Sequence, residues 1–168
     1  MAHQSSLAEV RSAAGTEFAE RDTFSVVTPT GDGRRPESEF PESQPKDYFV
    51  TRDGLTFAGS HVLADMWGAH HLNDQNVIEA ALRAAIDACG ATLLHIHLHR
   101  FSDNGGISGV AVLAESHISV HTWPERGFAA FDIFMCGSCD PEKAVPVLKR
   151  YFSPEQISIG HHRRGVVG

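Results

Sequence analysis

Apolar and polar residues alternate along residues 91–101, ATLLHIHLHRF, which predicts a β-strand with two different faces. Its aliphatic residues would face a helix-covered core, and its histidines would face the opposite side. The two sets are Leu94, Ile96 and Leu98, and His95, His97 and His99. Comparable patterns predict further strands at LTFAGSHVLADMWG, GISGVAVLAE, SHISVHTW, GFAAFDIFMCG and ISIGHHRRG.

Two other segments have the spacing and the end signals of helices. LNDQNVIEAALRAAIDACG predicts a helix that Asn73 or Asp74 caps and Gly90 ends. DPEKAVPVLKRYF predicts a second helix, with Asp140 as its cap and Pro141 at its first position. The order of elements favours an α+β fold, a two-layer sandwich with both helices on one face of a largely antiparallel sheet.

The second face of this predicted sheet is too polar for a dry core and too aromatic for plain solvent. Its polar residues on the later strands are His117, Ser119, His121, Asp132 and Cys136. Its aromatic residues are Phe101, Trp123, Phe128 and Phe134. A face of this composition indicates contact with a partner or a binding site.

Composition narrows the class of protein. The chain has 168 residues, of which 42% are hydrophobic and 21% charged, as expected for one soluble domain. Its net charge of -7 argues against a nucleic-acid partner held through phosphates. No apolar run suits a membrane span, and the first residues lack the regions of a signal peptide. Three cysteines without a secretion signal fit the reducing cytoplasm.

The N-terminal part differs in composition from the rest of the chain. The stretch TPTGDGRRPESEFPESQPKD is rich in Pro, Glu, Ser and Gly and poor in aliphatic residues. Residues 1–48 are therefore expected to be a disordered or loosely attached extension, and residues 49–168 to form the folded domain.

Several short motifs allow more than one chemistry. Three histidines in HIHLHR suit zinc or iron, but alternate strand residues lie about 7 Å apart, which favours surface or interface histidines. CGSC at 136–139 suits a redox dithiol or half a zinc site, and one functional cysteine beside a bystander is favoured. SDNGGISG lacks the Walker lysine and favours a turn. Ser116 and His121 suit a nucleophile and its base, without a G-x-S-x-G elbow.

Taken together, these motifs have a known counterpart. LAESHISVHTWPERGFAAFDIFMCG closely resembles the core of the bacterial and archaeal S-adenosylmethionine decarboxylases that depend on a pyruvoyl group. GSHVLADMWGAHHLND, GATLLHIHLHRF and GISGVAVLAESH resemble the segments before that core. The resemblance covers roughly residues 55–152, and FSDNGGISG is one residue longer than the usual family pattern.

The resemblance implies a self-processing proenzyme. The Ser116 hydroxyl would attack the Glu115 carbonyl, and the cut would give a β chain, residues 1–115, and an α chain, residues 116–168. Ser116 would become the pyruvoyl group, which forms a Schiff base with the substrate amine and accepts electrons as carbon dioxide leaves. His121 and Ser108 would assist processing.

Further roles follow from the same resemblance. Cys136, not Cys139, would donate the proton to the product, Glu125 would hold the ribose hydroxyls, and Phe101 would stack on the substrate. The family implies homodimers that join sheet to sheet in an αββα arrangement, with active sites at the interface and no required metal.

The expected function is conversion of S-adenosylmethionine to S-adenosyl 3-(methylthio)propylamine and carbon dioxide for spermidine biosynthesis, as a carboxy-lyase. A pyruvoyl enzyme acting on another amino acid, such as arginine or ornithine, is the first alternative, because the processing motifs do not define the substrate. A non-catalytic, histidine-rich metal-binding protein is the alternative from another class.

Overall fold

A computed structural model describes residues 48–167. The extension expected over residues 1–48 lies outside the described residues except for Tyr48, whose carbonyl accepts a hydrogen bond from the Gly137 N–H at 3.1 Å. The described elements run in the order β1 (Val50–Arg52), β2 (Leu55–Phe57), β3 (Gly59–Trp67), α1 (Gln75–Cys89), β4 (Leu93–Arg100), β5 (Ile107–Leu113), β6 (Ser116–Trp123), the 3-10 turn η1 (Pro124–Arg126), β7 (Phe128–Met135), the 3-10 turn η2 (Pro141–Lys143), α2 (Ala144–Phe152) and β8 (Gln156–Arg164).

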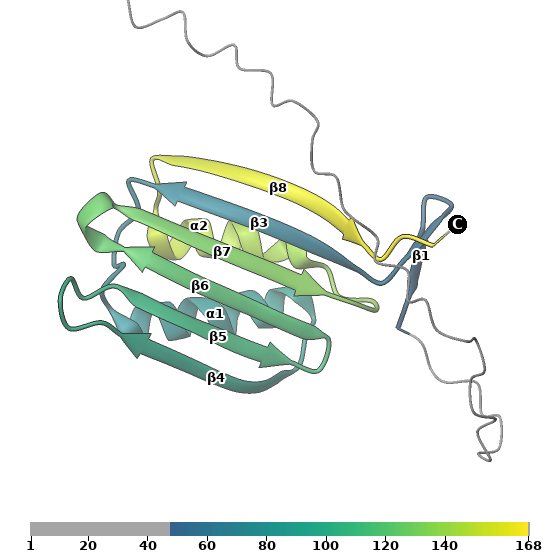
Figure 1. Ribbon diagram of the computed structural model, residues 1–168, viewed down its shortest axis with the longest axis horizontal. Helices are drawn as coiled ribbons and strands as arrows, with labels where there is room; N and C mark the ends of the chain where they lie inside the picture. Colours follow the sequence, from purple (N-terminus) through teal and green to yellow (C-terminus); the bar gives the residue numbers. More distant parts are fainter. Residues whose placement is uncertain (1–47, 168) are drawn as a thin grey trace, which may run out of the picture. The chain divides into compact units, whose positions relative to one another are not determined.

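One six-stranded sheet organises this domain. Its strand order is β4-β5-β6-β7-β3-β8, and every described pairing is antiparallel, while β1 and β2 form a separate hairpin. Both helices lie on the same face of the sheet (Figure 1). The predicted α+β fold with two layers is confirmed. None of the described helices is long and apolar enough to cross a membrane.

The first helix begins at the aspartate that the sequence indicates, and the second does not. The Asp74 carboxylate accepts hydrogen bonds from the N–H groups of Asn76 and Val77 at 3.0 and 3.2 Å, so Asp74 is the cap of α1. Gly90 ends α1 with a φ of 72°, a conformation that glycine adopts without strain. Asp140 caps η2 rather than α2, because a 3-10 turn precedes the second helix.

The core lies between the helices and one face of the sheet. The buried residues of α1 are Ile78, Ala81, Leu82, Ala85, Ile86 and Cys89. They meet alternate residues of the central strands, which include Val62, Ala64, Met66, Ile118, Val120, Phe131 and Ile133. Each fully buried large side chain of this kind contributes about 1.5–3 kcal/mol to folding. This helix-covered layer fixes which face of each strand remains outside.

One residue of β4 does not follow the predicted alternation. Leu94 was expected in the core, but its side chain is 64% exposed, and Leu93 packs against the core instead. The pairing of β4 with β5 shifts between Leu93 and His95, which marks a bulge. A bulge inserts one extra residue, so the residues before it change faces while those after it keep theirs. Ile96 and Leu98 pack against the core as expected.

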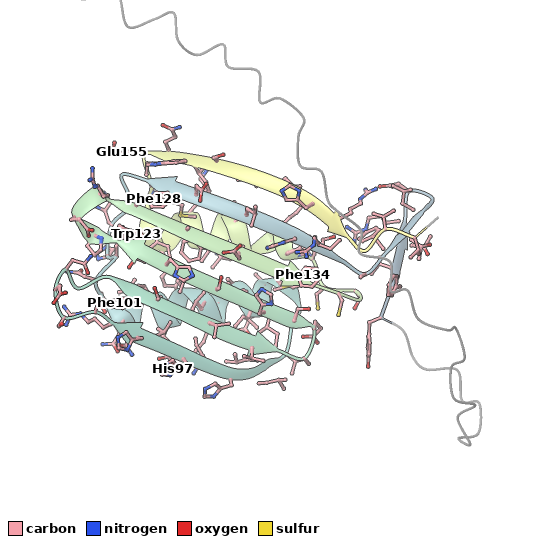
Figure 2. All side chains as sticks on the ribbon, viewed as in Figure 1. His97, Phe101, Trp123, Phe128, Phe134 and Glu155 are labelled. Atoms are coloured by element: carbon pink, nitrogen blue, oxygen red, sulfur yellow. The ribbon has the colours of Figure 1, made fainter. Side chains whose placement is uncertain are left out.

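The opposite face of the sheet has no cover from the described residues. It is lined by His61, Asp65 and Trp67 of β3, by alternate residues of β6 and β7, and by the histidines of β4. Large aromatic side chains remain exposed there, with 38% exposure at Trp67, 40% at Trp123 and 48% at Phe101. We call this surface the open face, and Figure 2 labels Phe101 and Trp123 at one end of it.

Candidate active site

Glu115, Ser116 and Cys136 lie together at one end of the sheet. Ala114 and Glu115 form the turn between β5 and β6, and Ser116 is the first residue of β6. The Glu115 carbonyl accepts a hydrogen bond from the backbone N–H of Cys136, which directly follows β7, at 3.0 Å. An N–H group aimed at this oxygen stabilises the negative charge that develops there when the carbonyl carbon is attacked.

The backbone of Ser116 has an unusual conformation. Its φ is 139°, on the positive side where residues with a side chain are rare. Such a conformation costs about 1–3 kcal/mol and persists only where the surroundings hold it. The Glu115–Ser116 peptide bond therefore combines a held carbonyl with a strained residue, which suits a bond that reacts.

Ser108 and His121 form a second group on the open face. They are direct partners in the pairing of β5 with β6, and Ser108 Oγ lies 2.9 Å from His121 Nδ1. The Ser108 hydroxyl donates to Nδ1 when that nitrogen carries no proton. This pairing provides a hydroxyl and an imidazole that can exchange protons with a neighbouring group.

A cavity of about 450 Å³ adjoins this second group. It is lined by Phe101, Asp103, Asn104, Ser108, Thr122 and Trp123. Two aromatic side chains and one carboxylate suit a ligand that combines a flat ring with positive charge. The sequence identified Phe101 and Ser108 in advance, and the structure brings them together here.

Glu125 lies in η1, next to the loop that follows β4. Asn104 Nδ2 donates to both carboxylate oxygens of Glu125, at 3.2 and 3.3 Å. Asn104 Oδ1 in turn accepts from the Gly106 N–H at 2.9 Å, which fixes the amide within its own loop. Asn104 thereby holds the Glu125 carboxylate beside the cavity.

The two groups lie at opposite ends of the sheet. Ser116 and His121 are five positions apart on β6, a separation of roughly 17 Å along an extended strand. Figure 2 shows the same division, with Phe101 and Trp123 at one end and Phe134 toward the other. Within one copy of the chain, His121 and Ser108 do not reach the Glu115–Ser116 bond.

The comparisons with known proteins bear on this arrangement. A family model described as S-adenosylmethionine decarboxylase matches residues 60–165. The chain belongs to this family. A family member named S-adenosylmethionine decarboxylase proenzyme, from Methanococcus maripaludis, is 45% identical over 112 residues, which cover 65% of this chain and 91% of the relative. The proenzyme of the same name from Thermomicrobium roseum is 40% identical over 110 residues, which cover 65% of this chain and 95% of the relative.

A solved structure agrees with the family. The crystal structure of the adenosylmethionine decarboxylase from Aquifex aeolicus aligns with a TM-score of 0.57 and 35% identity, covering 66% of this chain and 92% of that chain. The resemblance, the fold class and the decarboxylase function predicted from the sequence are confirmed. The enzyme is a carboxy-lyase, and the arginine, ornithine and metal-binding alternatives receive no support from these comparisons.

The thiols of this S-adenosylmethionine decarboxylase family member are not equivalent. Burial raises the pKa of Cys89 to about 11, and burial followed by the Glu115 carboxylate raises the pKa of Cys139. Cys139 Sγ donates to the Gly90 carbonyl at 3.3 Å. A thiol with a raised pKa is a poor nucleophile, so neither favours redox chemistry. Cys136 is only partly buried, and among residues 48–167 no three His, Cys, Asp or Glu side chains gather as metal ligands.

Sequence reasoning missed four residues of the site. Asn104 and Asp103 lie in a loop where the sequence indicated only a turn, and Trp123 was recognised only as an exposed aromatic residue. The fourth is Thr92, whose N–H donates to Glu115 Oε2 at 2.9 Å. The hydrogen bond from Asn104 to Glu125 joins residues 21 positions apart, and the one from Thr92 to Glu115 joins residues 23 positions apart. No local sequence pattern identifies contacts of this length.

The buried hydroxyl of Thr122, one of the residues that line the cavity, is hydrogen-bonded to the backbone around it. Thr122 is 6% exposed, and its Oγ1 donates to the Leu72 carbonyl at 2.7 Å and accepts from the Ile107 N–H at 2.8 Å. These two bonds satisfy backbone groups that would otherwise be buried without partners. They also tie β6 to β5 beside Ser108 and to the segment before α1.

Proposed function

We propose that this decarboxylase makes its own pyruvoyl cofactor by cutting the chain between Glu115 and Ser116. It then converts S-adenosylmethionine to S-adenosyl 3-(methylthio)propylamine and carbon dioxide, and the product serves spermidine biosynthesis. The observation that carries the proposal is the Glu115 carbonyl, held at 3.0 Å by the Cys136 N–H next to a strained Ser116. The word proenzyme in the names of the relatives supports it.

The cut begins with the Ser116 hydroxyl. Its oxygen attacks the Glu115 carbonyl carbon, and the Cys136 N–H stabilises the negative charge on the carbonyl oxygen. The C–N bond then breaks, the nitrogen takes the hydroxyl proton, and an ester joins the two residues. A histidine removes the Cα proton of Ser116, and the ester bond to the Ser116 oxygen breaks. This step releases the main-chain carboxylate of Glu115, which becomes the C-terminus of the β chain. Water then hydrolyses the remaining dehydroalanine, which releases ammonia and leaves the pyruvoyl group on the α chain.

The residues of the chain then bind the substrate and move its protons. The pyruvoyl group supplies an electron sink for the pair left when carbon dioxide departs. The Cys136 thiol donates the proton that the product carbon needs. Glu125, held by Asn104, binds the ribose hydroxyls, and Phe101 stacks against the flat or cationic part of the substrate.

The division of the site favours a homodimer of cut protomers. Because His121 and Ser108 lie roughly 17 Å from Ser116 within one copy, a second copy has to supply them. In such a dimer the two open faces pack together about a two-fold axis, and the strands of the two copies run in opposite directions. The end of one sheet that carries Ser116 then lies against the end of the partner's sheet that carries Ser108 and His121. This packing covers Trp67, Trp123 and Phe101 and yields four layers in the order αββα.

The proposal also assigns the enzyme to the cytoplasm. Cys89, Cys136 and Cys139 are all free thiols in the described part of the chain. A reducing compartment keeps them in this form, and the proposed role of Cys136 requires a thiol.

Intact mass spectrometry of the purified protein tests the cut. We expect two fragments, residues 1–115 and 116–168, with a pyruvoyl group and no free amine on the second. Release of carbon dioxide from carboxyl-labelled S-adenosylmethionine, with arginine and ornithine as controls, tests the substrate. A single chain with ordinary termini would contradict the self-processing proposal, and release from either control alone would contradict the substrate.

Mixed copies test the division of the site. Ser116→Ala and His121→Ala variants, each expressed alone, are expected to remain uncut. Expressed together, they form mixed dimers in which one site has both Ser116 and His121, so part of the His121→Ala copy is expected to be cut. Two affinity tags identify the copies, and His121→Ala with the double variant Ser116→Ala/His121→Ala, a mixture that has Ser116 but no His121, is the control that should remain uncut. No cutting in the first mixture would show that both residues act within one copy.

A further inference from the structure

Glu115 is held at two points rather than one. Its carbonyl accepts from the Cys136 N–H at 3.0 Å, and its side chain Oε2 accepts from the Thr92 N–H at 2.9 Å. Cys136 follows β7 and Thr92 precedes β4. In the sheet, β4 lies next to β5 and β7 lies next to β6, so the two donors flank the β5–β6 turn. Glu115 binds one donor on each side of this turn.

The contact with Thr92 is part of a closed loop of hydrogen bonds. The Ala114 N–H donates to the Thr92 carbonyl at 3.0 Å, next to the bond from the Thr92 N–H to Glu115. Thr92 thus binds both residues of the turn, one through its carbonyl and the other through its N–H. Removing the Glu115 carboxylate leaves a single hydrogen bond between the turn and the start of β4.

The carboxylate acts in this contact as a hydrogen-bond acceptor. Among residues 48–167, none of the ion pairs involves Glu115. The neutral amide of glutamine also presents an oxygen acceptor at the same distance from the backbone. Alanine presents none.

We propose that the Glu115 side chain is a positioning residue for self-cleavage: its hydrogen bond to the Thr92 N–H holds the Glu115 carbonyl on the Cys136 N–H and Ser116 in its strained conformation. The inference rests on the proposed function and deepens it. The side chain does not touch the reacting atoms. Its effect ends once the bond is cut, because the position of the carbonyl then no longer matters for turnover.

The rate of cleavage tests this role, measured in a cell-free translation pulse followed by gel separation. We expect Glu115→Ala to be cut about 10- to 100-fold more slowly than the natural chain, the effect of losing one charge-assisted hydrogen bond. Glu115→Gln keeps the acceptor without the charge and should be slowed by less than about tenfold, and less than Glu115→Ala. Glu79→Ala, which removes an exposed carboxylate of α1, is the control and should be cut at the natural rate.

Two further readouts separate positioning from a general structural effect. The kcat and KM of the material that does cleave should be unchanged in Glu115→Ala. In the uncut Ser116→Ala background, the Thr92 amide should be protected from hydrogen exchange, and adding Glu115→Ala should remove that protection. This second measurement also applies if the single variant cleaves too slowly to follow.

Cleavage of Glu115→Ala at the natural rate, or unchanged protection of the Thr92 amide, would overturn the inference. Glu115→Gln as slow as Glu115→Ala would also overturn it, because charge rather than an acceptor would then be needed. A changed kcat in the cleaved material would assign the side chain to the substrate site instead. Failure of the natural chain to cleave would overturn the proposed function itself.

Discussion

Ser116→Ala is expected to yield a single uncut chain without decarboxylase activity. The alanine methyl group has no oxygen to attack the Glu115 carbonyl, so neither the ester nor the ketone forms. Loss of a covalent nucleophile lowers turnover by about 10⁴-fold or more, and here the cofactor is lost with it. Intact mass spectrometry and carbon dioxide release measure the two effects on the same sample.

The control for this variant is a serine outside the site. Ser158 lies on the edge strand β8 and is exposed, so Ser158→Ala should be cut and active at natural levels. The Ser116→Ala chain should keep the natural fold, because the turn is held through Glu115 and Ala114. A cut or active Ser116→Ala protein would assign the cofactor to another residue.

Cys136→Ala is expected to separate cleavage from turnover. The backbone N–H of residue 136, not its side chain, holds the Glu115 carbonyl, so the chain should still be cut. The thiol proposed to return a proton to the product is missing, and loss of such a general acid lowers kcat by about 10²- to 10⁴-fold. KM should change little, because the cavity residues are unaltered. Mass spectrometry gives the extent of cleavage, and steady-state kinetics give kcat and KM.

Cys139→Ala is the matched control for Cys136→Ala, because it removes the other thiol of the same CGSC turn. Cys139 is buried and donates to the Gly90 carbonyl, so its loss should lower stability rather than kcat. Natural turnover in Cys136→Ala would show that another group protonates the product. An uncut Cys136→Ala chain would show that the thiol takes part in cleavage as well.

Local patterns in the sequence were sufficient for most of the fold. Alternation indicated the strands, and Asp74 with Gly90 indicated both ends of α1. The exception, Leu94, arises because a bulge inserts one residue into β4, and periodicity alone does not reveal where pairing with the next strand shifts. Sequence therefore predicts elements better than the register between them.

For the candidate site, the sequence likewise indicated individual residues but not the contacts between them. The motifs indicated Ser116, His121, Cys136 and Glu125, but they did not indicate that β6 keeps Ser116 and His121 apart within one copy. The partners of these residues were not accessible, because Asn104 and Glu125 are 21 residues apart and Thr92 and Glu115 are 23 apart. Such contacts depend on how two turns meet at a sheet edge, which tertiary packing decides.

The strand order has a consequence for the two products of the proposed cut. Strands β3, β4 and β5 belong to residues 1–115, and β6, β7 and β8 belong to residues 116–168, so the sheet order β4-β5-β6-β7-β3-β8 interleaves the two polypeptides. Neither fragment retains a complete sheet by itself, and β3 pairs with the other fragment on both sides. The precursor folds as one molecule, whereas the denatured mature protein has to reassemble from two. After the proposed cut, recovery from denaturation should therefore depend on concentration, and we expect the enzyme to assemble once, before it is cut.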